Sequence, residues 1–208
     1  MQFIFLLIPL LLFALLIWLM TNKKGKGLSG EIVVSSLLNK LDRDKYFTIN
    51  DITLKVNGKT AQIDHIVVSC YGIFVIETKN WEGSVYGSRW GKYLYRYFGG
   101  VKKSYQNPIR QNIGHIKRLE DVLSEYPNLK YISIVEFGGY TKRKIKDDIT
   151  IKISEILDTI GSYKEEVISE EDRDRVYSKL KSLKKEGENY KKVHVENVDR
   201  KYGKKNFY

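Results

Sequence analysis

Residues 3–20 form a continuous apolar run, FIFLLIPLLLFALLIWLM, that contains no charged side chain. As a helix rising about 1.5 Å per residue, the run would span roughly 27 Å, close to the thickness of the hydrocarbon core of a bilayer. A helix on the surface of a soluble domain needs a polar face, and this run has none. We therefore expect residues 3–20 to form one transmembrane helix.

The residues that follow this run indicate its orientation. Lys23, Lys24 and Lys26 lie in a short basic linker, residues 21–26, and no small-residue cleavage site typical of a signal peptide precedes them. Positive flanks tend to stay in the cytoplasm, so we expect the N-terminus outside and the rest of the chain in the cytoplasm. The single cysteine, Cys70, is consistent with a reducing compartment.

The remaining length suits one domain with a tail. We expect a domain over residues 27–187 with its core in 27–140, followed by a polar, basic and loose tail over 188–208. The chain has 36 Lys and Arg against 25 Asp and Glu, a net charge of +11, and all of it lies after the apolar run. This charge suits contact with nucleic-acid phosphates, or attraction to anionic lipid, and charge by itself does not choose between them.

Apolar patterning predicts an α/β fold, a mixed sheet flanked by helices. Ser29 is expected to cap a helix beginning at Gly30, and Asn107-Pro108 begins a second helix. The expected strands are 46–54, 61–70, 72–79, 131–137 and 149–153, with Asn57-Gly58 as a hairpin turn. Further helices are expected over 154–162 and from Ser169 to about Lys185.

Two acids lie inside apolar strands, Asp64 in QIDHIVVS and Glu77 in FVIETK. Burying a carboxylate without a partner is unfavourable, and two carboxylates at one place suit Mg²⁺. Lys79 lies on the same strand face as Glu77 and could orient a water molecule or offset negative charge on a phosphate. The alternative is a structural ion pair between Glu77 and Lys79 near the strand end.

Other polar residues accompany this pattern. His65 lies on the opposite strand face from Asp64, so we expect a packed histidine rather than a metal ligand. Gln111 and His115 are four residues apart on one helix, and form either a polar edge facing the site or a hydrogen-bonded helix surface. Glu31 projects from the apolar stripe of the first helix.

Residues 81–104 interleave aromatic and basic side chains and are expected to form an irregular hairpin. Aromatic rings among cations suit base stacking and phosphate contact, although alternate aromatics of a hairpin can equally pack on a core. Candidate nucleic-acid contacts are Trp81, Arg89, Trp90, Lys92 and Arg110.

Three segments resemble one known family: GLSGE at 27–31, QIDHIVVSCYGIFVIETKNWEGSVYG at 62–87 and NPIRQNIGHI at 107–116. Together they resemble the nuclease-related domain, NERD, of the PD-(D/E)xK nuclease superfamily. The resemblance covers residues 27–140 firmly and extends more weakly to about 187.

The resemblance implies a restriction-endonuclease-like core. It implies Mg²⁺, replaceable by Mn²⁺, held by Asp64, Glu77 and the carbonyl of Thr78, with Lys79 positioning the attacking water. Glu31 would correspond to the acid of the first helix, and Gln111 and His115 would support the site. Gln62, which flanks Asp64, is a further candidate supporting residue. His115 stands where the RecB-like branch of the superfamily has tyrosine.

These observations favour a membrane-anchored, metal-dependent nuclease acting on DNA or RNA. A non-catalytic tether that holds nucleic acid or a protein at the membrane is the second hypothesis. The third is an interaction domain that keeps the fold and neither cuts nor binds nucleic acid.

Overall fold

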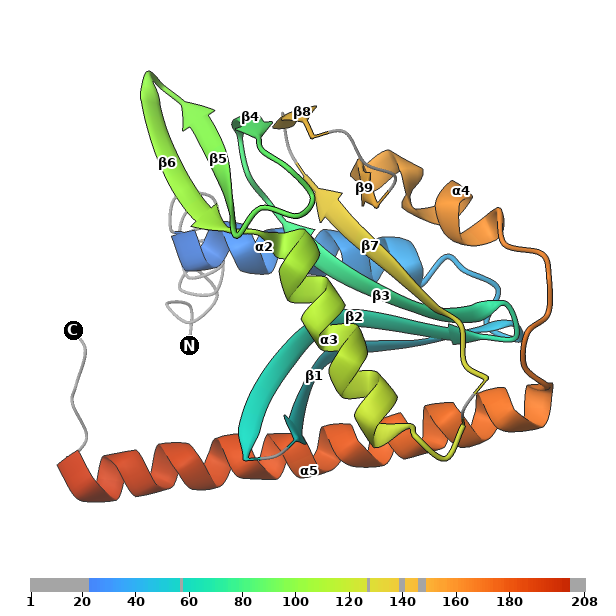
Figure 1. Ribbon diagram of the computed structural model, residues 1–208. Coiled ribbons are helices and arrows are strands. Elements are labelled where there is room, and N and C mark those ends of the chain that lie inside the picture. Colours follow the sequence, from blue (N-terminus) through green and yellow to red (C-terminus); the bar gives the residue numbers. More distant parts are fainter. Residues whose placement is uncertain (1–22, 57, 127, 139–140, 146–148, 203–208) are drawn as a thin grey trace, which may run out of the picture. The chain divides into compact units, whose positions relative to one another are not determined.

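The computed structural model describes residues 23–202 except 57, 127, 139–140 and 146–148 (Figure 1). The expected transmembrane helix over residues 3–20 lies outside the described residues. Within the described range, no helix combines the length and apolar character needed to cross a bilayer.

The chain is a mixed α/β protein whose described residues form two mixed sheets and four α-helices. The order is α2 (Lys23–Leu38), β1 (Tyr46–Val56), β2 (Lys59–Ser69), β3 (Gly72–Lys79), β4 (Gly83–Tyr86), β5 (Tyr93–Phe98), β6 (Val101–Gln106), α3 (Pro108–Val122), β7 (Tyr131–Phe137), β8 (Thr141–Lys144), β9 (Thr150–Ile151), a 3-10 turn (Ile153–Glu155), α4 (Ile156–Gly161) and α5 (Glu170–Tyr202).

The chain divides into two compact units. The first unit comprises the N-terminal part through Leu41 with residues 77–111 and 134–162, and the second comprises residues 42–76, 112–133 and 163 onward. Strands β3 and β7 and helix α3 each pass from one unit into the other.

The larger sheet has the strand order β1-β2-β3-β7-β9. Strands β1, β2 and β3 are antiparallel, with Ile49 paired to Ile66 and Ile66 to Val75, whereas β7 and β9 run parallel. Within the second unit, α3 and α5 supply Leu119, Val176 and Leu180 to the core against these strands, and Leu123 joins them directly after α3 ends. These helices cover the face of β3 that carries Ile73 and Val75. The opposite face is buried as well, with the Phe74 ring against that of Tyr163, so seven of the eight residues of β3 are buried.

The smaller sheet, order β6-β5-β4-β8, lies wholly in the first unit. Figure 1 shows its four strands beside one another. It corrects two expectations: residues 81–104 form three paired strands rather than an irregular hairpin, and the fold has two sheets rather than one. The fourth strand, β8, is the segment TKRK, whose apolar content is too low to signal a strand.

The two terminal helices are longer than the sequence predicts. Helix α2 begins at Lys23 instead of Gly30, so Ser29 is not its cap; the Ser29 hydroxyl instead accepts a hydrogen bond from Asn80. Helix α5 is capped by Ser169, as predicted, but ends at Tyr202, so the expected loose tail is largely helical. That segment is rich in Lys and Glu and contains no proline, which permits a helix without an apolar stripe.

Candidate active site

The end of strand β3 carries the acid and the lysine that the sequence singled out. Glu77 is 1% exposed and Thr78 is buried, while Lys79 is half-buried where the strand reaches the surface. The Lys79 ammonium donates a hydrogen bond to Glu77 Oε1, so the two groups form an ion pair inside the first unit. The ion pair places a cation beside the buried carboxylate, on the same strand face.

Asp64 is half-buried on β2, in the second unit. It directly precedes His65, which pairs with Ile76 at the end of the described ladder between β2 and β3. Glu77 directly follows Ile76 along the chain. Asp64 thus belongs to the second unit and Glu77 to the first.

Strand β1 contributes an acid that the sequence reasoning missed. Asp51 stands opposite Asp64 in the β1–β2 register, between the pairs formed by Asn50 with His65 and by Ile52 with Ile63. It has φ of +50°, a left-handed conformation that aspartate tolerates better than most residues. The Gln62 amide donates a 2.8 Å hydrogen bond to Asp51 Oδ1.

His65 is a packed residue, as expected. It is 2% exposed, and its Nδ1 forms a 2.8 Å hydrogen bond with Asn50 Oδ1 on the neighbouring strand. The histidine therefore ties β1 to β2 on the buried face.

Helix α2 approaches the end of β3 through a glycine. A Cβ at Gly30 would lie 2.9 Å from Asn80 Cβ and 3.4 Å from Thr78 Cγ2, so a larger residue would push the helix away. Glu31, half-buried, follows this glycine directly. The GLSGE segment therefore places Glu31 next to the glycine at which the helix meets Thr78 and Asn80.

A second buried acid lies in the first unit, on β7. Glu136 is 1% exposed, and its Oε1 accepts no hydrogen bond from the described residues. Burial raises the pKa of Glu136 to about 7, against the opposing effect of Arg143. The sequence carried the signal, because YISIVEF places an acid inside an apolar strand just as GIFVIETK does.

Glycine 138 connects the ends of β7 and β3. Its N–H donates to the Lys79 carbonyl at 3.1 Å. A Cβ at Gly138 would lie 3.2 Å from Glu136 Oε1 and 3.3 Å from Asn80 Oδ1. Glycine thus leaves room beside the Glu136 carboxyl group.

Helix α3 presents its polar residues at different depths. Gln111 is half-buried and His115 is 5% exposed. Between them, Asn112 donates to the Val75 carbonyl at 2.8 Å and to Ser133 Oγ at 2.9 Å. Asn112 was not singled out from the sequence, and it fixes the helix to β3 and β7 within the second unit.

Three of the predicted nucleic-acid contacts come together. Trp90 is 72% exposed, the Arg89 guanidinium lies 5.0 Å from its ring centre, and Arg110 Nη1 donates to the Trp90 carbonyl at 3.4 Å. Lys92 lies elsewhere, over the ring of Tyr93.

Trp81 has a different environment from the other predicted contacts. Its ring centre lies 4.8 Å from that of Tyr105 and 5.5 Å from that of Phe137, and it is half-buried. This ring is therefore part of an aromatic cluster of the first unit.

The loop that carries Trp90 is held by Asn107, which is fully buried. Asn107 Nδ2 donates to the carbonyls of Ser88, Arg89 and Gly91, at 3.1, 3.1 and 2.8 Å. Its Oδ1 accepts from the Ile109 N–H and caps α3, as predicted. One amide therefore starts the helix and fixes the Arg89–Trp90 turn.

Comparison with known proteins defines the class. The model of the nuclease-related domain family, NERD, matches residues 26–138, and the chain belongs to this family. It is also 32% identical, over 191 residues, to an uncharacterized protein of Bacillus anthracis, with 87% of each chain covered. No solved structure matches the chain.

Proposed function

We propose that this chain is a membrane-anchored, metal-dependent nuclease that hydrolyses phosphodiester bonds of DNA or RNA through a restriction-endonuclease-like core. The observation that carries the proposal is Glu77, a carboxylate 1% exposed at the end of a doubly buried strand, with Lys79 bonded to it. Membership in a nuclease-related family supports the same assignment.

The proposed metal ligands are the carboxylates of Asp64 and Glu77 and the carbonyl of Thr78. Each carboxylate interrupts an apolar stretch, IDHIVV in β2 and FVIET in β3, which supports this choice. Among the described residues, no group of three or more His, Cys, Asp and Glu could hold a metal. Two carboxylates and a carbonyl nevertheless fit Mg²⁺, which prefers oxygen ligands and keeps several waters; Mn²⁺ is the expected substitute.

A bound Mg²⁺ supplies a water of lowered pKa and offsets charge on the phosphate. Lys79 positions the attacking water with its ammonium group, which already lies against the Glu77 carboxylate. Glu31, Gln62, Gln111 and His115 are the proposed supporting residues. Asp51 joins them, because it accepts the hydrogen bond of Gln62 opposite Asp64.

The membrane anchor is proposed for residues 3–20, with the N-terminus outside and the domain in the cytoplasm. The apolar run and the lysines of residues 21–26 support it.

A non-catalytic tether is the second candidate. It is favoured by the ion pair itself, since Lys79 pairs with Glu77 Oε1 as it would in a structural ion pair. The exposed Trp90 with Arg89 and Arg110 would then bind nucleic acid without cleavage. This candidate predicts salt-sensitive binding that survives loss of Asp64.

The test uses the full-length chain in neutral detergent with labelled single- and double-stranded DNA and RNA, in Mg²⁺ or EDTA. Wild type is compared with Asp64→Asn and with Asp158→Asn, an exposed acid on α4. The nuclease predicts metal-dependent cleavage that Asp64→Asn abolishes and Asp158→Asn retains. Binding without cleavage by folded wild type would favour the tether.

A further inference from the structure

The smaller sheet has two chemically different faces. Tyr86 pairs with Tyr95, and Tyr97 pairs with Lys102, so these side chains share one face. Because side chains alternate along a strand, Tyr93 lies on the same face, and Lys144 joins it as the partner of Tyr86. We call this set the tyrosine–lysine face: Tyr86, Tyr93, Tyr95, Tyr97, Lys102 and Lys144.

The rings of this face are available to a ligand. The four tyrosines have relative exposures of 37%, 45%, 41% and 48%, in chain order. Ammonium groups lie beside them, Lys102 at 4.5 Å from the ring centre of Tyr95 and Lys144 at 5.1 Å from that of Tyr86. A ligand that stacks on a ring would therefore meet a cation next to it.

The charges of the smaller sheet are all positive. The four strands contain six Lys and Arg and no Asp or Glu. Between Glu82 and Glu120 the sequence has eight Lys and Arg and no acid. The charge is therefore complementary to a polyanion.

The exposed tyrosine rings indicate which class of polyanion fits this face. Neighbouring strands are about 5 Å apart and alternate residues of one strand about 7 Å apart, so the tyrosines present a ladder of stacking surfaces. Bases of a single strand can stack on such rings. The bases of a duplex are already stacked on one another, so their faces are not accessible. Lipid headgroups would engage the lysines and leave the rings unexplained.

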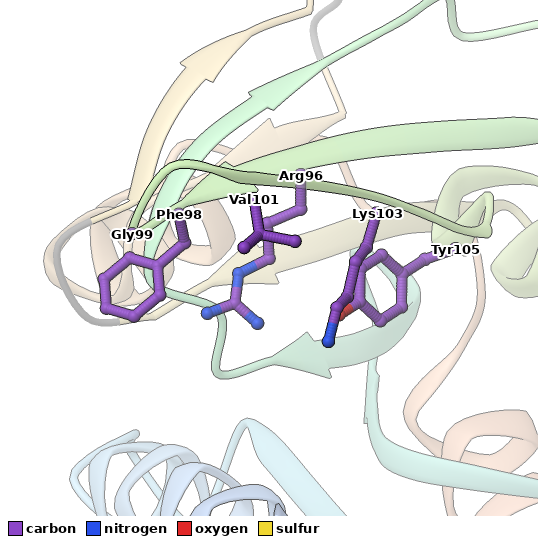
Figure 2. A pocket seen from close by; sticks show the side chains of 6 residues that line it. All are labelled: Arg96, Phe98, Gly99, Val101, Lys103 and Tyr105. Atoms are coloured by element: carbon purple, nitrogen blue, oxygen red, sulfur yellow. The ribbon is translucent and has the colours of Figure 1, made fainter.

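The opposite face is less suited to this ligand. It holds a hollow of about 370 Å³ lined by Arg96, Phe98, Gly99, Val101, Lys103 and Tyr105. Figure 2 shows these residues on β5, on β6 and in the turn between the two strands. The Arg96 guanidinium is already engaged, because its Nε donates to the Glu82 carbonyl at 2.6 Å and it lies over the Phe98 ring.

We propose that the tyrosine–lysine face binds single-stranded nucleic acid, with bases stacked on the tyrosines and phosphates held by Lys102 and Lys144. The inference rests on the proposed function in taking this strand as the substrate. Strand β4 begins four residues after Lys79, within roughly 14 Å of it along the chain. A nucleic-acid strand bound on this sheet can therefore place a phosphate near Glu77 and Lys79.

The test measures binding by the full-length Asp64→Asn chain in EDTA, so that nothing is cut. Probes are labelled single-stranded DNA and RNA, and duplexes of equal length. We expect tighter binding to single strands, with affinity reduced about tenfold by Tyr95→Leu or Tyr97→Leu and retained by the corresponding phenylalanine variants. Duplex preference, or equal effects of leucine and phenylalanine, would overturn the proposal.

Two adjacent lysines give a matched control. Lys102 lies on the tyrosine–lysine face and Lys103 on the hollow's face, and both are exposed. Lys102→Ala should weaken binding and lower the slope of log affinity against log salt by about 0.7, while Lys103→Ala should leave both nearly unchanged. Equal effects, or displacement of the strand by soluble short-chain phosphatidylserine, would contradict a nucleic-acid face. The wild-type cleavage assay tests the nuclease separately.

Discussion

Glu77 and Glu136 occupy equivalent positions in two apolar strands, and each is 1% exposed. The residue two positions later differs: Lys79 follows Glu77, and Gly138 follows Glu136. Lys79 donates to its acid, whereas Gly138 leaves space beside Glu136, whose pKa burial raises to about 7. The sequence pattern therefore locates buried acids, and the neighbour on the same strand face determines how each is stabilised.

The largest expected effect is a difference in cleavage rate between variants of Glu77 and of Glu136. Glu77→Gln should lower Mg²⁺-dependent cleavage about a thousandfold, because it removes a proposed metal ligand and the anion bonded to Lys79. Glu136→Gln should lower cleavage at neutral pH less than tenfold. Single-turnover rates on a labelled single strand measure both. Equal losses would mean that the two acids act as one site.

Removing the cation should make Glu77 resemble Glu136. Lys79→Met leaves a buried carboxylate without its ammonium, and we expect the free energy of unfolding to fall by about 2–3 kcal/mol, moderated by the partial exposure of Lys79. The double variant Lys79→Met with Glu77→Gln should recover part of this loss. Denaturant unfolding measures both; no recovery would argue against a coupled pair.

The raised pKa of Glu136 predicts a pH-dependent stability. Below about pH 4.5 the acid is protonated in both states. Between about pH 4.5 and 7 the unfolded state loses the proton that the native state keeps, so stability falls, by about 3 kcal/mol in total. The Glu136→Gln variant should not show this loss of stability with rising pH. The difference in unfolding free energy between wild type and variant across this range measures it, and a constant difference would refute the raised pKa.

The smallest effect concerns the space beside Glu136. Gly138→Ala places a Cβ about 3.2 Å from Glu136 Oε1 and 3.3 Å from Asn80 Oδ1. We expect a loss of about 1 kcal/mol, because both neighbours must shift slightly. Thermal unfolding of the variant checks this. As a comparison, Gly161→Ala meets no atom within 4 Å and should not destabilise α4.

The sequence predicted the elements whose apolar pattern is local. Strands β3 and β7 have the predicted bounds, and Asn107 caps α3 as expected. The smaller sheet was not predicted, because β8 is a polar tetrapeptide that pairs with β4 more than fifty residues away. Long-range pairing of this kind leaves no local periodicity.

The candidate site remains a prediction, and only some of its residues could be read from the sequence. Asp64, Glu77 and Lys79 were identified as acids and a cation in apolar strands, whereas Glu136 fits the same criterion and was overlooked. The sequence did not show that Asn107 also holds the loop of Trp90, or that Asn112 fixes α3 to the sheet. The hydrogen-bond partners of an asparagine depend on the fold.

The most direct test of the central claim is Mn²⁺ binding to the full-length chain, followed by electron paramagnetic resonance, for wild type, Asp64→Asn, Glu77→Gln and Glu136→Gln. We predict one site in wild type that Asp64→Asn and Glu77→Gln lose and Glu136→Gln retains. A wild type that binds no Mn²⁺, or a Glu77→Gln variant that binds it as tightly as wild type, would show that Glu77 serves the ion pair with Lys79 and not a metal.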